Sequence, residues 1–333
     1  MQSLDQKATR PIRILSIDGG GIRGLLPSQF LTSLESETGR PTHELFDVVT
    51  GSSIGALIAI GLVTPQEGRA PRSALEITGI LADESEEVFR RRHFIEDLPF
   101  KRLGLAKVRY GGDSLEEFIT TLIGDETLLT SALCRLLVPA VDLQRHRLKL
   151  FDSARVGSPY LMKDVALATT AAPSYFNPHV IEGGNGIQAT STYVDGSAAA
   201  NNPSALAVAA EAEQILQAGL TLVSLGTGKV PDHQPKDFRG SGLIDWRDEL
   251  APLVINSSSD ATFRIIEKLV AAAQTQATSA RPIRQFRIDP KLSHEVELDD
   301  ASEKAILTLG HAYQDWKKAD GKQTLHELAR ILT

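Results

Sequence analysis

The chain begins with two strand–turn–helix units, one directly after the other. Residues 12–17, IRILSI, are a short apolar run that predicts a buried strand, and the leucine and phenylalanine spacing over 25–37 predicts a helix. A second apolar run at 46–51, FDVVTG, leads into a strongly apolar helix predicted over 52–62. Two such units in succession are typical of a parallel α/β sheet, in which the turns after both strands lie at the same edge.

Further strands and helices continue this pattern along the chain. Strands are expected at 135–143, 149–153, 193–195, 220–225 and 284–288, and helices at 164–178 and 203–216. The last hundred residues read as mostly helical apart from the late strand. No internal repeat and no long linker divides the chain, so we expect one domain over 11–333. Its motif-bearing part covers about 11–230, and a mainly helical part covers about 241–333.

The composition argues against several classes of protein. The 333 residues are 42% hydrophobic, as in an ordinary globular protein. The net charge of -7 argues against a nucleic acid polymer as partner, because such a partner needs a basic face. The single cysteine, Cys134, cannot form an intrachain disulfide, and its apolar neighbours predict a small buried side chain. The polar N-terminus and the lack of a long apolar run predict a cytoplasmic protein without a transmembrane helix.

A glycine-rich turn follows the first strand. Gly19, Gly21 and Gly24 have the spacing G-x-G-x-x-G of a dinucleotide-binding turn. Such a site also needs an acidic residue at the end of the next strand, where it binds the ribose of the cofactor. That strand ends in TGSSIG, whereas Glu44 and Asp47 lie at its other end. We therefore expect no nucleotide cofactor, and we expect the turn to hold a different anion.

The second strand ends in the motif G-x-S-x-G, which is formed by Gly51, Ser53 and Gly55. Between a strand and a helix this motif predicts a nucleophile elbow, because the glycines permit a tight turn that projects the serine hydroxyl above the sheet. The N-terminus of the following helix favours negative charge at the same place. The alternative is a serine that only caps the helix.

An attacking serine needs hydrogen-bond donors for the oxyanion of the tetrahedral intermediate. The first turn supplies them, because Gly19, Gly20 and Gly21 carry no side chains and their N–H groups can converge on an anion. Arg23 is placed to fix this loop or to stabilise the charge. Since both turns follow sequential parallel strands, we expect the serine and the glycines at the same edge of the sheet.

The serine also needs a base to take its proton. None of the histidines lies in a turn-rich strand end of the kind that fixes a catalytic imidazole, although a Ser–His–Asp esterase acting on neutral esters remains an alternative. The eight histidines are His43, His93, His146, His179, His233, His294, His311 and His326. Asp195 ends an apolar strand in YVDGS and enters a turn with Gly196. In a partly desolvated cleft a raised pKa makes such an aspartate an adequate base.

Three motifs resemble those of the patatin-like phospholipases: IDGGGIRG at 17–24, GSSIG at 51–55 and YVDGS at 193–197. The stretches TTAAPSYF, ANNP and SLGTG are also similar to that family, so the resemblance covers most of 11–300. It implies a three-layer α/β/α fold with a central, mainly parallel sheet. It further implies hydrolysis of ester-linked fatty acids from membrane glycerophospholipids.

For the site, the resemblance implies a Ser–Asp dyad, Ser53 and Asp195, that works without histidine, cofactor or metal. The other residues that it implies form the oxyanion hole: Gly19, Gly20, Gly21 and Arg23. Family members tend to have Gly or Ala after the Asp-Gly pair, where this chain has Ser197. That difference bears only on the local geometry of the turn. A binding module without hydrolysis is a further alternative, but the presence of both Ser53 and Asp195 favours an enzyme.

The expected partners follow from the same resemblance and from one basic segment. The enzyme would be cytoplasmic, and peripheral at the inner membrane when active. Residues 88–110 interleave basic and aromatic side chains, which is consistent with docking on anionic lipid, with a lid, or with a site for a phosphate-bearing activator. Some bacterial members of the family are anti-phage effectors switched on by cyclic nucleotides, so a cyclic nucleotide is a candidate activator.

Overall fold

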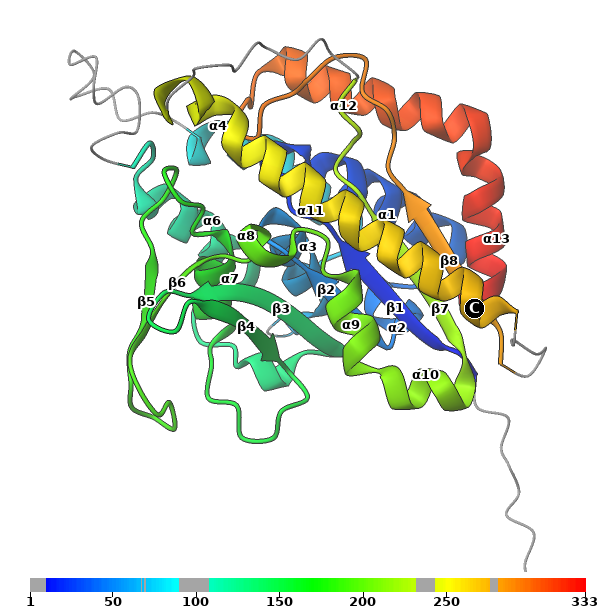
Figure 1. Cartoon of the computed structure of the whole chain (residues 1–333), viewed down its shortest axis with the longest axis horizontal. Helices are drawn as coiled ribbons and strands as arrows, with labels where there is room; N and C mark the ends of the chain where they lie inside the picture. Colours follow the sequence, from blue (N-terminus) through cyan, green and yellow to red (C-terminus); the bar gives the residue numbers. More distant parts are fainter. Residues whose placement is uncertain (1–9, 67, 69, 90–107, 232–242, 276–280) are drawn as a thin grey trace, which may run out of the picture.

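The computed structural model describes residues 10–66, 68, 70–89, 108–231, 243–275 and 281–333. Eight strands form one sheet in this part of the chain: β1 (Ile12–Ile17), β2 (Val48–Gly51), β3 (Arg135–Asp142), β4 (Arg147–Asp152), β5 (His179–Ile181), β6 (Ser191–Asp195), β7 (Leu220–Leu225) and β8 (Ile283–Ile288). Their order is β5-β6-β3-β2-β1-β7-β8, and β4 also pairs with β3 (Figure 1). Pairing is parallel from β3 to β8 and antiparallel for β4, β5 and β6, so the sheet is mostly parallel, as predicted.

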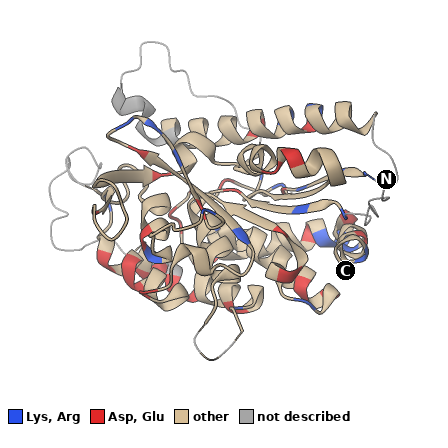
Figure 2. Ribbon diagram, turned by 90° about the horizontal axis from the view of Figure 1, so that it is seen from below, with Lys and Arg blue, Asp and Glu red and all other residues tan. Residues whose placement is uncertain are grey.

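Helices cover both faces of this sheet (Figure 2). They are α1 (Leu25–Thr38), α2 (Thr42–Leu45), α3 (Ile54–Val63), α4 (Ala74–Val88), α6 (Gly112–Ile123), α7 (Met162–Thr170), α8 (Ser197–Ala200), α9 (Ser204–Ala210), α10 (Ala212–Ala218), α11 (Leu243–Gln274), α12 (Glu303–Trp316) and α13 (Lys322–Leu332). Successive residues of a strand point to opposite faces, so β1 contributes to two apolar clusters. Leu15 and Ile17 pack against the layer that contains α1, α3, α7 and α12, whereas Ile14 packs against α9 and α11. The predicted three-layer α/β/α fold is confirmed.

Two predicted helices are shorter than the sequence pattern indicates. The helix expected over 164–178 ends at Thr170, because Pro173 cannot continue it and Ser174 has a φ of 72°. The helix expected over 203–216 is divided into α9 and α10 at Glu211. The Glu211 carboxylate accepts a 2.6 Å hydrogen bond from Arg135, and its φ of −108° interrupts the helical backbone. The short strand β5 and the helices α4 and α6 were not predicted.

The C-terminal helices pack onto the same core as the motif-bearing part. Leu325, Leu328 and Leu332 of α13 are almost fully buried in the cluster that contains α1 and α3. The Arg13 guanidinium at the start of β1 donates a 3.0 Å hydrogen bond to the carbonyl of Ile331. No helix in the described ranges combines the length and apolar character needed to cross a bilayer.

Candidate active site

Two strand ends meet at one edge of β3. β2 pairs with β3 over residues 135–137, and β6 pairs with it over 140–142. Because β4 occupies the opposite edge of β3 over 137–142, β2 and β6 share the remaining edge. β2 runs parallel to β3 and β6 runs antiparallel, so their carboxyl ends point toward each other. Ser53 lies just after β2 and Asp195 ends β6, and this topology brings them together.

Ser53 lies at the tight turn between β2 and α3, with a φ of 53° and a ψ of −126°. A positive φ is rare for a residue with a side chain, and it persists only where the surrounding packing holds it. A Cβ on Gly55 would overlap the carbonyl oxygens of Ile17 and Asp18, and a Cβ on Gly51 would overlap the backbone of Gly55. The two elbow glycines therefore let the start of α3 approach the end of β1.

The Ser53 hydroxyl donates a 2.6 Å hydrogen bond to Oδ2 of Asp195. Asp195 is 4% exposed, and burial raises the pKa of its carboxyl to about 6. Hydrogen bonds from Ser53 and Ser197 act in the opposite direction. A carboxylate with this pKa is a better acceptor for the serine proton than an exposed aspartate, so the pair can act as nucleophile and base.

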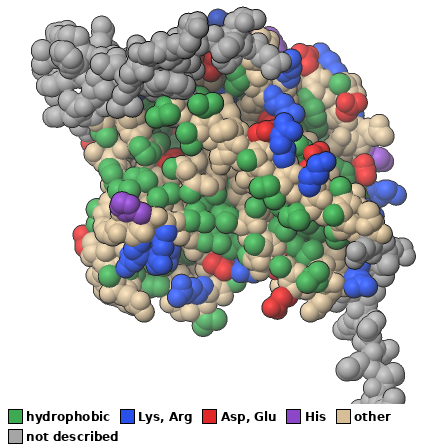
Figure 3. Space-filling view, in the orientation of Figure 1, with side chains coloured by type: hydrophobic (Ala, Val, Ile, Leu, Met, Phe, Trp, Pro, Cys, Tyr) green, Lys and Arg blue, Asp and Glu red, His purple; other side chains and the backbone are tan. Residues whose placement is uncertain are grey.

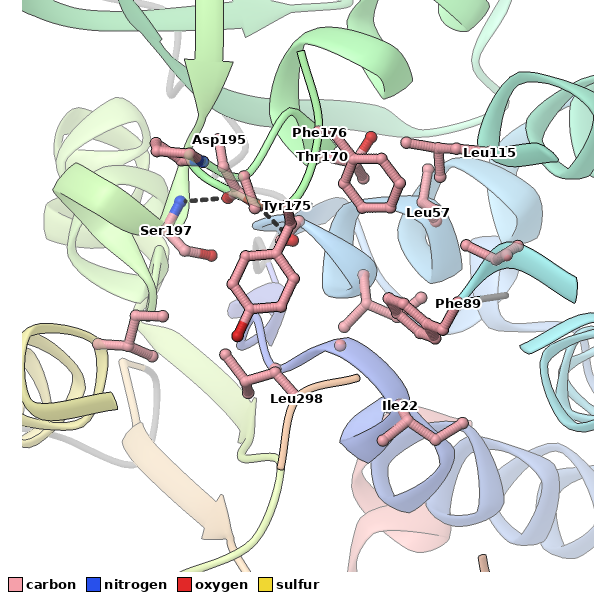
Figure 4. A pocket seen from close by; sticks show the side chains of 18 of the residues that line it. Ile22, Leu57, Phe89, Leu115, Thr170, Tyr175, Phe176, Asp195, Ser197 and Leu298 are labelled. Atoms are coloured by element: carbon pink, nitrogen blue, oxygen red, sulfur yellow. Dashed lines mark hydrogen bonds between the residues drawn. The ribbon is translucent and has the colours of Figure 1, made fainter. Parts of the chain in front are cut away.

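Two further residues hold the pair in position. Thr169 Oγ1 accepts the Ser53 N–H at 3.2 Å and donates to the Pro139 carbonyl at 2.7 Å. The N–H of Ser197 donates to Asp195 Oδ1 at 2.7 Å (Figure 4). Because this last bond comes from the backbone, it does not depend on the side chain at position 197. Sequence reasoning did not assign a role to Thr169, although it lies in the stretch TTAAPSYF that carries part of the resemblance.

The three glycines of the first turn differ in their hydrogen bonding. The Gly19 N–H donates to the carbonyl of Asn201 at 3.1 Å, so the expectation that it faces an anion needs correction. The N–H groups of Gly20 and Gly21 have no acceptor among the described residues. Gly20 and Gly21 also line the cavity that contains Ser53 and Asp195, whereas Gly19 does not. The loop can therefore offer two N–H groups to an oxyanion.

Arg23 follows the three glycines in the same loop but is not among the residues that line the cavity. Its side chain is 3% exposed and does not line the cavity, so the prediction of direct charge stabilisation by Arg23 also needs correction. Burial lowers the pKa of its guanidinium, and the charges of Asp289, Glu295 and Asp18 oppose that shift. The position is consistent with the other predicted role, which is to fix the loop.

A buried ion pair anchors the start of the glycine loop. Asp18 accepts hydrogen bonds of 3.0 and 2.8 Å from the two terminal nitrogens of Arg287 on β8. Arg287 also donates to Asp289 at 3.1 Å and to Ser224 at 2.9 Å. Burial raises the pKa of Asp18 to about 6, although the charge of Arg287 opposes the shift. Arg287 is remote from every motif in the sequence, so no local pattern could have identified it.

The cavity above Ser53 has a volume of about 490 Å³ and is mostly apolar. Figure 4 shows aromatic and aliphatic side chains around Asp195. They come from α3, α4, α6, α11 and two loops, and they include Leu57, Phe89, Leu115, Phe118, Tyr175, Phe176, Val254 and Leu298. A pocket with one polar corner and long apolar walls fits a substrate that has a reactive group at one end of a hydrocarbon chain.

No histidine in the described part of the chain lines this cavity. His93 and His233 lie outside the described residues. The same part of the chain holds no group of three His, Cys, Asp or Glu side chains arranged to bind a metal. The geometry therefore supports Asp195, rather than any described histidine, as the partner of Ser53.

Most of the basic segment at 88–110 lies outside the described residues. The residues outside the described ranges are Arg90, Arg91, Arg92, Phe94, Phe100, Lys101, Arg102 and Lys107. Of the remainder, Phe89 lines the cavity. Arg109 donates a 2.8 Å hydrogen bond to Asp299 and lies over the ring of Tyr175 at 4.7 Å, so its charge is paired inside the protein.

Comparison with known proteins shows the family of this chain. The family model described as patatin-like phospholipase matches residues 15–208. Patatin-like protein 2 of Arabidopsis thaliana is 32% identical over 292 residues, which are 77% of this chain and 70% of that protein.

Two bacterial proteins are also similar. A cGAMP-activated phospholipase of Escherichia coli is 34% identical over 206 residues, covering 58% of this chain and 54% of that protein. A cGAMP-activated phospholipase of Vibrio cholerae is 26% identical over 337 residues, covering 92% of this chain and 88% of that protein. With the family model matched over more than half of its length, this chain belongs to the patatin-like phospholipases and is a lipid acyl hydrolase.

Proposed function

We propose that the chain removes fatty acids from membrane glycerophospholipids through a Ser53–Asp195 dyad. The observation that carries this proposal is the 2.6 Å hydrogen bond between Ser53 and a buried carboxylate at the floor of an apolar cavity. The cavity walls accept the acyl chain, and the ester carbonyl then lies at Ser53.

The reaction has two steps. Ser53 Oγ attacks the ester carbonyl carbon while its proton passes to Asp195, and the N–H groups of Gly20 and Gly21 bind the resulting oxyanion. Collapse of the tetrahedral intermediate breaks the bond between the carbonyl carbon and the lysolipid oxygen. That oxygen takes the proton from Asp195, and the acyl group stays on Ser53 as an acyl-serine. Water, deprotonated by Asp195, then attacks the acyl-serine, and the fatty acid departs as the Ser53 hydroxyl recovers its proton.

We also propose that a cyclic nucleotide activates the enzyme, as part of anti-phage defence. The support for this finer proposal is the similarity to two bacterial phospholipases that are described as activated by cGAMP. We further propose that the enzyme acts as a peripheral protein at the inner membrane.

Fatty-acid and lysolipid release from bacterial phospholipid vesicles tests both proposals. Wild type and Ser53→Ala are compared with and without a panel of cyclic di- and trinucleotides. Serine-dependent release only with one nucleotide supports a gated enzyme, and serine-dependent release without any nucleotide removes the activator from the account. If Ser53→Ala releases as much as wild type, the dyad proposal fails. No release under any condition, with hydrolysis of neutral esters, would favour the Ser–His–Asp esterase.

A further inference from the structure

Helix α11 exposes an apolar face on the side of the molecule that carries the cavity. The face contains five large aliphatic side chains with exposed fractions between 43% and 59%: Leu250, Leu253, Val254, Ile265 and Leu269. They are spaced over about 28 Å of helix. They lie in two groups on one side of the helix, one at 250–254 and one at 265–269, and exposed apolar surface of this kind marks a contact site for a partner or a lipid.

The opposite face of α11 accounts for its attachment to the protein. Ser259, Ile266 and Val270 are buried, at the seven- and four-residue intervals that share one side of a helix. Ile266 and Val270 belong to the apolar cluster that also contains residues of β1, β2, β3 and β7, and Ser259 accepts a 2.8 Å hydrogen bond from Asn201. The exposed aliphatic residues are therefore not needed to hold the helix on the sheet.

The exposed face is continuous with the mouth of the cavity. Leu250 and Val254 line the cavity and are also 45% and 43% exposed, so they form part of its rim. Pro173 and Ala198 likewise line the cavity and are exposed. Figure 3 shows hydrophobic side chains gathered in the middle of the face that α11 crosses in Figure 1.

We propose that this α11 face, with the cavity rim, docks on the surface of a lipid bilayer. The inference rests on the proposed function, because a substrate that enters an apolar cavity across an apolar rim comes from an apolar phase. A phospholipid can then move its acyl chain from the bilayer into the cavity without exposing the chain to water. An interfacial helix of this type lies along the surface with its apolar side toward the acyl region.

The charges on the helix indicate how the surface binds. Arg264 lies among the exposed aliphatic residues, but it donates a 2.6 Å hydrogen bond to Asp260 one turn earlier. Its charge is thus balanced locally. Lys268 is also exposed between Ile265 and Leu269 and adds one positive charge, so the aliphatic residues supply the main term in docking and attraction to anionic lipid a smaller one. Binding to zwitterionic vesicles is therefore expected, and it should persist at high salt.

Vesicle binding and two kinds of substrate test the proposal. Flotation with phosphatidylcholine vesicles is measured in the Ser53→Ala background, so that the lipid is not consumed. The test variant is the double substitution Ile265→Glu/Leu269→Glu. Neither of these residues lines the cavity. The matched control is Leu216→Glu on α10, where a leucine is 74% exposed outside this face. In the corresponding proteins that retain Ser53, hydrolysis is measured on vesicles and on a short-chain ester that is monomeric in water.

The double variant is expected to lose roughly tenfold or more in vesicle binding and vesicle hydrolysis. Its hydrolysis of the soluble ester should stay within about twofold of wild type, as should every activity of the control. Unchanged vesicle binding in the double variant, or an equal loss in the control, would overturn the docking surface. Vesicle binding that disappears when the salt concentration rises from about 0.05 to 0.5 M would also overturn the docking surface. Absence of soluble-ester hydrolysis by the wild type, both with and without the panel of cyclic nucleotides, would instead refute the proposed function.

Discussion

Burial beside Ser53 raises the pKa of Asp195, and this shift makes the stability of the fold depend on pH. The carboxyl has a pKa of 3.8 when exposed and about 6 in the folded protein. The unfolded chain therefore releases this proton first as pH rises, and the folded state is progressively disfavoured between about pH 4 and pH 6. Removing the charge removes that penalty.

We expect Asp195→Asn to gain stability over wild type as pH rises through this window. The gain should level off above pH 6 at about 3 kcal/mol, because each unit of pKa difference corresponds to about 1.4 kcal/mol. Urea unfolding of both proteins at a series of pH values measures it. Because Asp18 is unchanged in both proteins, its own titration cancels in the difference. A difference that does not vary with pH would show that Asp195 is not titrating near pH 6.

The sequence could predict the proposed Ser53–Asp195 pair because both residues lie in short motifs at strand ends. Ser53 is centred in G-x-S-x-G, and Asp195 is in the Asp-Gly turn after an apolar strand. The supporting residues could not be found in this way. Thr169 and Arg287 act only through contacts made by the folded chain, and the backbone hydrogen bond of Gly19 to Asn201 is invisible to any local pattern.

The contact between β1 and the start of α3 depends on the absence of a side chain at residue 55. We expect Gly55→Ala to lower the free energy of unfolding by more than about 2 kcal/mol, because its Cβ would press on the backbone of Ile17 and Asp18. Gly79 in α4 has open space around it, so Gly79→Ala should raise stability by about 0.5–1 kcal/mol. Chemical denaturation of the two variants compares them. Equal effects at the two positions would contradict this view of the elbow.

The glycine loop is tied to β8 through Asp18 and Arg287. Arg287→Met leaves the Asp18 carboxylate buried without its partner and should cost about 3–5 kcal/mol of stability. Asp18→Asn/Arg287→Met removes both charges and should recover part of that loss. The free energies of unfolding of wild type, Asp18→Asn, Arg287→Met and the double variant form a thermodynamic cycle. Strict additivity of the two changes would show that the pair is not coupled.

Element boundaries were harder to predict than the elements themselves. The parallel strands were found because they are short apolar runs closed by turns. The end of α7 was missed. The division between α9 and α10 was also missed, because it is set by the tertiary contact of Glu211 with Arg135. The three-residue strand β5 has too little sequence to be recognised.

The C-terminal part shares the core of the motif-bearing part, so we propose that the described chain unfolds as one unit. Leu328 in α13 is fully buried, and Leu328→Ala should cost about 2–5 kcal/mol. It should shift the whole unfolding transition without splitting it. Leu307→Ala, at a position 52% exposed, should change stability by less than about 0.5 kcal/mol. Circular dichroism together with intrinsic tryptophan fluorescence follows both variants. Two separated transitions would indicate that α13 belongs to an independent unit.

The identity of the nucleophile is the central claim for the whole molecule. It can be tested by mass-spectrometric mapping after treatment with a lipid-like fluorophosphonate, which modifies an activated serine covalently. We predict a single modified residue, Ser53, with labelling reduced by roughly a hundredfold or more in Asp195→Asn and unchanged in His294→Ala. Labelling of another serine, or labelling of Ser53 that depends on a histidine and not on Asp195, would contradict the Ser–Asp dyad.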